Sequence, residues 1–226
     1  METKYWYLQN HTLFDQLSQQ EIAELNIISC FKTANKSEYV YLGGRDLTRL
    51  YILKKGRVKI AFQSESGEEV VMEILKDGDI FGAVGLEVQP NHHQEYAQAL
   101  TDVALCSFTI PDFVSVMQKN PELAIRYSKK LGEKVNTVQG KFANIIFKDS
   151  RERIVNFFRL NALHEGHQQA DGSYLLDMYL THQDIAHFTA VSRQTVTTII
   201  NQLIVQQLIV YVGRRKVVIP NLNKLG

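Results

Sequence analysis

The sequence predicts an α+β protein made of a jelly-roll β-domain, a long helix and a winged helix-turn-helix. Short apolar runs alternate with glycines over residues 38–110, a helical repeat begins at Pro121, and two short helices and a basic hairpin follow. The 226 residues, 45% of them hydrophobic, suffice for two modest domains that each bury a core. We expect the β-roll over residues 1–120, the long helix over 121–148 and the helix-turn-helix domain over 149–226.

Charge is balanced over the whole chain but not along it. The formal net charge is +1, with 25 Lys and Arg residues against 24 Asp and Glu residues. Residues 185–226 contain no Asp or Glu, and their cations are Arg193, Arg214, Arg215, Lys216 and Lys224. An acid-free stretch of this length predicts a local positive surface, which attracts polyanions.

Several classes of protein are excluded by what the sequence lacks. Cys30 and Cys106 are too few for a disulfide framework or a four-cysteine metal site. The first residues, METKYWYLQNHTLF, form no apolar signal core, and no window of about 20 apolar residues follows. There is no Gly-rich phosphate loop, nucleophile elbow or HExxH motif. We expect a reduced, cytoplasmic protein that is not an enzyme, contacts no membrane, and needs no metal or cofactor.

Strands and glycine turns alternate in the N-terminal part. Residues 10–29 fit one or two short helices, and the apolar runs that follow are separated by glycines such as Gly56, Gly67 and Gly78. This spacing is typical of antiparallel barrels and jelly rolls. The segment RVKIAFQSESGEEVVMEIL predicts a hairpin, with period-2 strands on both sides of a Ser-Glu-Ser-Gly turn.

A seam close to a heptad repeat runs along the predicted long helix. A helix packed on its own domain would show a similar pattern. Because the seam is narrow and long and the outer face of the helix is charged, we favour pairing with a second copy across a two-fold axis. The predicted dimer seam consists of Tyr127, Leu131, Val135, Val138, Phe142 and Ile145.

Capping signals divide the C-terminal part into helices. Asp149 with Glu152, and Thr181 with Asp184, fit capping boxes that begin two helices. Between these helices, the segment HEGHQQADGSY predicts a polar loop. Ser192 is a good N-cap for a third helix, with Val196, Ile199, Ile200, Leu203 and Ile204 as its buried face.

The last two of these helices form a helix-turn-helix. Only Thr189-Ala190-Val191 joins them, and the glycine usual in this turn is absent. The following segment, LIVYVGRRKVVIP, predicts a hairpin whose turn is Gly213-Arg214-Arg215-Lys216. Three consecutive cations on a β-turn would make a wing over a phosphate backbone, although a charged tip can also serve only to prevent edge-to-edge pairing.

The second helix of the pair begins with side chains that can read base edges, namely Arg193, Gln194, Thr197 and Thr198. Arginine pairs with guanine O6 and N7, glutamine pairs with adenine N6 and N7, and threonine can contact a base or the thymine methyl group. Ser192 and Thr195 are placed for phosphates at the helix N-terminus. Taken singly, Ser192 could be only a cap and Arg193 only a solvated residue. Their combination with the basic wing favours DNA binding.

The chain resembles the Crp/Fnr family of bacterial transcription factors, named after the cyclic-AMP receptor protein and the fumarate-nitrate regulator. The matching stretches are YILKKGRVKI, LKDGDIFGAVGL, the long helix that ends at Asp149, and LTHQDIAHFTAVSRQTVTTIINQL. The resemblance covers nearly the whole chain and implies a cyclic-nucleotide-binding-like β-roll, a homodimer and a winged helix-turn-helix. It implies base reading by Arg193, Gln194 and Thr198, and phosphate contacts by Ser192, Thr195, His182, Gln183 and Arg151.

The chain departs from the family's usual pattern at two of the base-reading positions. The family often carries Glu where this chain has Gln194, and Arg where it has Thr198. A carboxylate accepts a hydrogen bond from cytosine, whereas a carboxamide favours adenine. We therefore expect a DNA site that differs from the family's best-known half-site.

The resemblance also implies an effector pocket, formed by Gly82, Ala83, Val84, Gly85, His93, Gln94, Val138 and Gln139. Members that bind cyclic AMP hold the ribose with a Glu and the phosphate with an Arg-Ser pair. Here Ala83 stands in the place of that Glu, and His93 and Gln94 stand approximately in the places of the Arg and Ser. Because a buried phosphate without a firm cation is costly to bind, we do not expect cyclic AMP as the effector. His92 and His93 fit a solvated pair better than a haem or metal site.

The leading hypothesis is a homodimeric transcription regulator that binds a palindromic site in double-stranded DNA. By resemblance, the loop over residues 164–172 would face RNA polymerase, and the protein would answer to an unknown small-molecule effector or need none. The alternative is a small-molecule sensor module that signals mainly through protein–protein contact.

Overall fold

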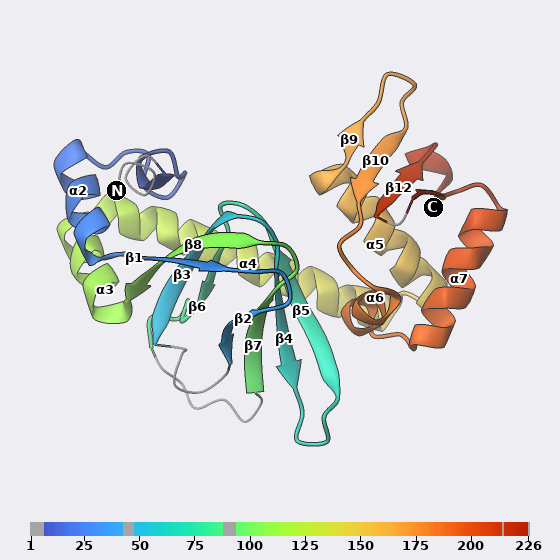
Figure 1. Ribbon diagram of the computed structural model, residues 1–226, viewed down its shortest axis with the longest axis horizontal. Coiled ribbons are helices and arrows are strands. Elements are labelled where there is room, and N and C mark those ends of the chain that lie inside the picture. Colours follow the sequence, from blue (N-terminus) through green and yellow to red (C-terminus); the bar gives the residue numbers. More distant parts are fainter. Residues whose placement is uncertain (1–6, 43–47, 88–93, 214, 226) are drawn as a thin grey trace. The chain divides into compact units, whose positions relative to one another are not determined.

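The computed structural model describes residues 7–42, 48–87, 94–213 and 215–225. The chain divides into two compact units, Met1–Thr137 and Val138–Gly226, and the division falls inside the 27-residue helix α4 (Pro121–Phe147). The predicted fold class is confirmed, since a β-roll, a long helix and a helix-turn-helix with a small sheet follow one another along the chain (Figure 1).

The first unit is a β-roll of two antiparallel sheets. One sheet has the strand order β1-β8-β3-β6 and the other has the order β2-β7-β4-β5. The strands are β1 (Cys30–Ala34), β2 (Tyr39–Leu42), β3 (Arg49–Lys55), β4 (Val58–Gln63), β5 (Glu69–Leu75), β6 (Ile80–Gly82), β7 (Gln94–Ala99) and β8 (Val103–Thr109).

The predicted hairpin is confirmed as the β4–β5 pair. Val58 lies opposite Leu75, and Gln63 lies opposite Glu69. Gly67 has a φ of +85° in the connecting turn, a backbone conformation that favours glycine, and its N–H donates to the Ser64 carbonyl at 2.9 Å. The hairpin extends from one end of the β-roll (Figure 1).

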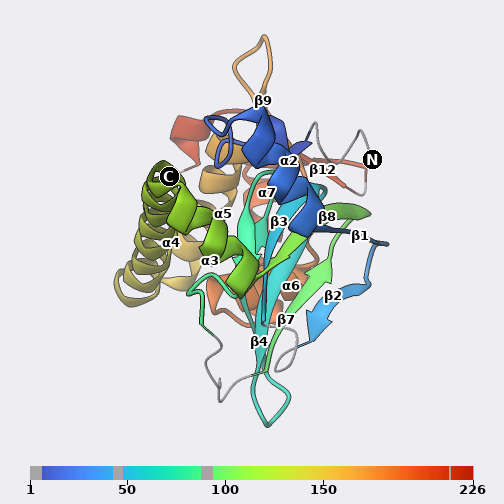
Figure 2. The same ribbon diagram turned by 90° about the vertical axis from the view of Figure 1, so that its left-hand side faces the viewer.

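Two apolar clusters hold this unit together. The cluster between the sheets includes a stack of three rings, with centroid distances of 5.5 Å between Tyr41 and Tyr51 and 5.2 Å between Tyr51 and Phe81. The second cluster joins α2 (Gln19–Ile28) and α3 (Ile110–Lys119) to the roll through side chains such as Leu25 and Phe113. Both views place α2 beside α3 at one end of the roll (Figure 2).

The structure corrects one position of the predicted dimer seam. Tyr127 is buried in the core of its own unit, with its ring 5.3 Å from that of Phe113 and its hydroxyl donating to the Val84 carbonyl at 2.5 Å. Its burial therefore removes it from any surface that a second copy could contact. Leu131 is half-buried against the same core. The remaining seam positions, Val135, Val138, Phe142 and Ile145, are exposed.

The second unit packs three helices against a four-stranded sheet with the order β11-β12-β10-β9. Its core includes Phe157 and Phe158 of α5, and Val196 and Leu203 of α7. Its elements are α5 (Ser150–Glu165), β9 (His167–Gln168), β10 (Tyr174–Asp177), α6 (His182–Thr189), α7 (Arg193–Val205), β11 (Val210–Val212), β12 (Lys216–Ile219) and the 3-10 turn η1 (Leu222–Lys224).

Two sequence expectations for this unit need correction. The segment 164–174 is not only a polar loop, because it contains the last two residues of α5, the short strand β9 and the first residue of β10, with which β9 pairs. The wing turn is also shorter than expected, since Lys216 already begins β12 and pairs with Val212. Of the described helices, none combines the length and the apolar character needed to cross a membrane.

The burial of His11 predicts a pH-dependent stability of the first unit. Its Nδ1 accepts from the Leu13 N–H at 3.1 Å, so Nε2 carries the hydrogen and donates to the Gly78 carbonyl at 3.1 Å. Burial lowers the pKa of His11 below its ordinary 6.5. The unfolded chain therefore binds more protons in this range, and the contribution of His11 is full above about pH 6.5 and is lost as the pH falls towards the lowered pKa.

We expect the free energy of unfolding of the first unit to fall by up to about 1.4 kcal/mol per pH unit in that window. The measurement is urea unfolding between pH 7.5 and 5, and replacement His11→Gln should flatten the slope. His167→Gln, at an exposed position, is the matched control and should leave the slope unchanged. Equal slopes in the wild-type chain and the His11 variant would contradict the expectation.

The turn between α6 and α7 predicts a stabilising substitution. Ala190 has φ 52° and ψ 49°, a left-handed conformation that costs an L-residue about 1–2 kcal/mol. Ala190→Gly should therefore stabilise the turn by about 0.5–1 kcal/mol, after the entropy that glycine gains in the unfolded chain is subtracted. Hydrogen exchange of the α6 and α7 amides in the full chain measures this. Ala186→Gly, inside α6, should instead destabilise by at least about 1 kcal/mol, and stabilisation at both positions would refute the turn argument.

Candidate nucleic-acid interface

Three capping interactions fix where the helices of the interface begin. The predicted capping boxes of Asp149 with Glu152 and of Thr181 with Asp184 are both confirmed. Ser192 is confirmed as the N-cap of α7, and its hydroxyl accepts from the Thr195 N–H at 3.1 Å. Because an N-cap defines the residue at which a helix begins, the first turn of α7 begins at Arg193.

The buried face of α7 determines which of its residues are exposed. Val196, Ile199, Ile200 and Leu203 are buried in the core of the second unit as predicted, whereas Ile204, predicted on the same face, is exposed. This leaves Arg193, Gln194 and Thr198 exposed on the opposite side. The Thr198 hydroxyl donates to the Gln194 carbonyl at 3.0 Å. It can therefore offer an approaching base an acceptor and a methyl group without breaking that bond.

The structure brings His182 of α6 to Thr197 of α7. Nδ1 of His182 lies 3.0 Å from the Thr197 hydroxyl oxygen, and this hydroxyl donates to the Arg193 carbonyl at 3.0 Å. Both Thr197 and His182 are half-buried, so Thr197 joins the two helices and is less open than the three residues at the tip. Burial first, and then the positive charge of Arg193, lower the pKa of His182 from its ordinary 6.5.

The other expected phosphate contacts are engaged with the protein itself. Ser192 and Thr195 have their hydroxyl oxygens 2.8 Å apart, in addition to the cap. Gln183 is exposed, with its amide nitrogen against Nε2 of His187. By helix geometry the N–H groups of Arg193 and Gln194 have no carbonyl four residues earlier within α7, so they are free to meet an anion at this end.

The structure does not bring Arg151 to the tip of α7. Its guanidinium donates to the side-chain oxygens of Gln202 at 3.2 Å and Gln206 at 2.7 Å. Gln202 comes nine residues after Arg193, which is about 13 Å along the axis of an α-helix. Any phosphate contact of Arg151 therefore lies at the far end of α7.

The wing carries less positive charge in space than in sequence. Arg215 and Lys216 are exposed, and Arg214 lies outside the described residues. Lys216 lies directly opposite Asp177 of the neighbouring strand β10. Sequence reasoning missed this acid because it counted charges only along residues 185–226. The pair depends on strand register, which neither segment specifies alone.

One further contact was not predicted. Nζ of Lys141 on α4 lies 4.0 Å above the centre of the Phe188 ring on α6, and Phe188 also contacts Phe157 at 5.6 Å. A cation over an aromatic face attracts the ring. The C-terminal part of α4 is thus tied to the helix-turn-helix inside the second unit.

The described residues of the expected effector pocket have different environments. Gly82 is the last residue of β6, and Ala83 is buried. Val84 packs on the core, Gly85 is exposed, and Gln94 begins β7. Val138 and Gln139 are exposed on α4. His93 lies outside the described residues, as does His92.

A partly buried acid lies in the roll at β7, and the cations near it are paired with other acids. Tyr41 donates to the Glu95 carboxylate at 2.5 Å, and burial raises the pKa of Glu95. Lys134 forms an ion pair with Glu73 at 2.6 Å. Among the described residues, no group of three or more His, Cys, Asp or Glu side chains could hold a metal ion.

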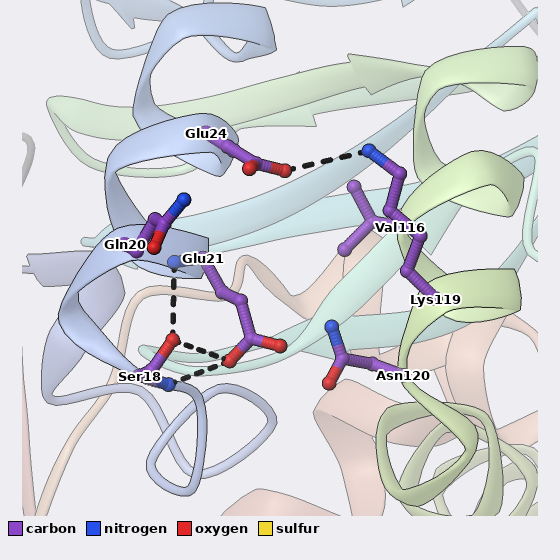
Figure 3. Close-up of a pocket in the computed structure, with 7 residues that line it drawn as sticks. All are labelled: Ser18, Gln20, Glu21, Glu24, Val116, Lys119 and Asn120. Atoms are coloured by element: carbon purple, nitrogen blue, oxygen red, sulfur yellow. Dashed lines mark hydrogen bonds and ion pairs between the residues drawn. The ribbon is translucent and has the colours of Figure 1, made fainter.

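A cleft of about 280 Å³ lies elsewhere, between α2 and α3, and contains none of the expected pocket residues. The charged side chains of the cleft have partners within it, because Glu21 accepts from the N–H and hydroxyl of Ser18 in a capping box and Lys119 pairs with Glu24 at 3.5 Å (Figure 3).

The sequence matches two family models. Residues 31–120 match the cyclic nucleotide-binding domain, and residues 152–226 match the Crp-like helix-turn-helix domain. The chain is similar to the global nitrogen regulator of Nostoc sp., with 28% identity over 76% of this chain and 77% of that protein. It is also similar to the cAMP-activated global transcriptional regulator CRP of Salmonella typhimurium, with 27% identity over 83% of this chain and 88% of that protein.

Solved structures share the fold. A mutant of CooA from Carboxydothermus hydrogenoformans superposes with a TM-score of 0.74 at 23% identity, covering 93% of this chain and 89% of that one. FixK2 from Bradyrhizobium japonicum superposes with a TM-score of 0.75 at 18% identity, covering 88% of this chain and 96% of that one. The two domain matches follow one another along the chain as the β-roll and the helix-turn-helix do in the structure, and the relatives named above are regulators. The chain therefore belongs to the Crp/Fnr family of transcription regulators.

Proposed function

We propose that the chain regulates transcription as a homodimer that reads a two-fold symmetric site in double-stranded DNA with α7. The observation that carries this proposal is the tip of α7, where Arg193 and Gln194 are exposed at a capped helix N-terminus within an acid-free sequence. Two copies of α7 related by a two-fold axis would enter major grooves about 34 Å apart.

The side chains at the tip specify what the site would contain. Arg193 would bind guanine O6 and N7, and Gln194 would bind adenine N6 and N7. The Thr198 oxygen, whose hydrogen is used inside the helix, would accept from an amino group or present its methyl group to thymine. Ser192, Thr195, His182, Gln183 and Arg151, with the wing residues Arg214, Arg215 and Lys216, would contact the phosphate backbone.

The exposed seam of α4 supports the dimer. Val135, Val138 and Phe142 are 54%, 54% and 65% exposed, which is unfavourable for a helix that stays in water. They follow the heptad-like spacing of paired helices. Pairing α4 with its copy would cover these side chains, together with Ile145 and the exposed part of the Leu131 side chain.

Cyclic AMP is not the effector in this proposal. Ala83 offers no carboxylate to a ribose, and the described cations beside β7 are already paired with acids, Lys59 with Glu69 and Lys134 with Glu73. The stacked rings of Tyr41, Tyr51 and Phe81 occupy the space between the sheets. The regulator therefore acts without a small ligand or with one unlike a cyclic nucleotide, and the β9–β10 hairpin is the surface we assign to RNA polymerase.

Replacing Arg193 tests the reading helix. Arg193→Ala should weaken binding to the duplex selected from a random pool by about 1–3 kcal/mol and relax specificity at one base pair. Competition binding at fixed salt measures both effects. Lys224→Ala removes one cation from the same unit outside the proposed contacts, and it should leave the base preference unchanged. Unchanged specificity in the Arg193 variant would favour an output through protein–protein contact.

A charge placed on the seam tests the dimer. Phe142→Glu should convert the dimer to a monomer, because it puts paired carboxylates into an apolar interface, and sedimentation velocity measures the change. Asn136→Glu adds the same charge to an exposed position on the opposite side of α4 and should leave the dimer intact. A Phe142 variant that sediments as the wild type would rule out this seam.

A further inference from the structure

The Thr197 hydroxyl oxygen lies 3.0 Å from Nδ1 of His182 and 3.0 Å from the Arg193 carbonyl, and it has one hydrogen to donate. We assign this hydrogen to the Arg193 carbonyl, the usual bond of a helical threonine to the carbonyl four residues earlier. The Thr197 oxygen is then left as an acceptor for Nδ1 of His182, at 3.0 Å. The neutral imidazole therefore carries its hydrogen on Nδ1, and Nε2 has only a lone pair.

A neutral His182 in this arrangement cannot hold a phosphate. Nε2 and a phosphate oxygen are both acceptors, so they repel each other when they meet. The imidazolium, in contrast, has two N–H groups and can donate to Thr197 and to a phosphate oxygen at once. Contact with DNA at this position thus requires an added proton.

The surroundings keep His182 neutral before DNA arrives. Burial and the Arg193 guanidinium on α7 both disfavour the imidazolium and hold the pKa of His182 low. On α6 itself, the Asp184 carboxylate is bound to the N–H and hydroxyl of Thr181, and His187 is bound to Gln183. From α4, Lys141 lies over the Phe188 ring. From α5, no described ionisable group acts on His182.

We propose that the chain takes up one proton at His182 of each protomer when it binds DNA, so that the phosphate contact forms only on the imidazolium. This inference rests on the proposed function and adds a regulation to it. The ligand is a phosphodiester oxygen of the duplex. The hydrogen-bonded series then runs from the phosphate through His182 and Thr197 to the Arg193 carbonyl, at the start of the reading helix.

The test is the pH dependence of binding to the selected duplex, measured by fluorescence anisotropy at constant ionic strength between pH 6 and 8.5. We expect Kd to rise with pH by up to about tenfold per pH unit for each His182. Titration calorimetry in two buffers of different ionisation enthalpy should show net proton uptake. His167→Gln, at an exposed position in β9, should keep the wild-type slope.

Three variants separate the proton from a structural role. His182→Gln should lose the slope and bind as weakly at pH 6 as at pH 8. His182→Arg carries a permanent charge, and it should bind more tightly than the wild type at pH 8 with little slope. Thr197→Val frees the ring to place its hydrogen on Nε2, which should reduce the slope and the proton uptake.

The outcomes are distinct for the two proposals. Tight duplex binding with a flat pH profile and no proton uptake would overturn the role of His182 and leave the proposed function standing. A slope that persists in His182→Gln would do the same. If the wild-type chain binds no duplex at any pH, both the proposed function and this inference fail.

Discussion

The interface depends on one constraint, the burial of the apolar face of α7 against α5 and α6. Val196, Ile200 and Leu203 are at most 1% exposed, and burying side chains of this kind contributes roughly 1.5–3 kcal/mol each. Because a helix turns once in 3.6 residues, holding that face inward also fixes the azimuth of Arg193 and Gln194 on the other side. The cap at Ser192 then fixes where the helix starts, and the left-handed turn at Ala190 fixes how it leaves α6. In the proposed complex, core packing would thus determine recognition, although none of the side chains that we propose to read bases belongs to the core.

Local interactions could be predicted from the sequence and long-range ones could not. The capping boxes at Asp149 and Thr181 span four residues each, and the β4–β5 hairpin spans one turn, so their signals are contiguous. Tyr127 has the same spacing as the exposed seam positions, and only the packing of α3 against α4 reveals that it is buried. Asp177 reaches Lys216 through strand register, and His182 reaches Thr197 through helix packing. No pattern within either segment specifies such a pair.

The interior of the β-roll carries the contacts on which we base the proposal that cyclic AMP is not the effector. Tyr41, Tyr51 and Phe81 stack between the sheets, and the hydroxyl of Tyr41 satisfies the buried Glu95 carboxylate. An incoming phosphate would repel the ionised Glu95 carboxylate and would favour its neutral form further, in a site where burial already raises its pKa. Lys134 on α4 is occupied by Glu73 of β5, which ties the helix to the roll. These contacts stabilise the roll and join it to the N-terminal part of α4.

The charges around the tip of α7 explain why a positive charge that forms only when His182 is protonated would matter to the proposed complex. Lys216 faces Asp177, and the Asp184 carboxylate caps the neighbouring helix, so part of the positive charge counted along the sequence is offset in space. Sequence-independent affinity grows with the number of phosphates that permanently charged side chains neutralise. Discrimination between DNA sequences would then depend on the hydrogen bonds of Arg193 and Gln194 to bases. The contacts of Thr197 with His182 and with the Arg193 carbonyl support this end of the helix. A proton on His182 adds charge beside that same end, and it does so only while a phosphate is present to stabilise it.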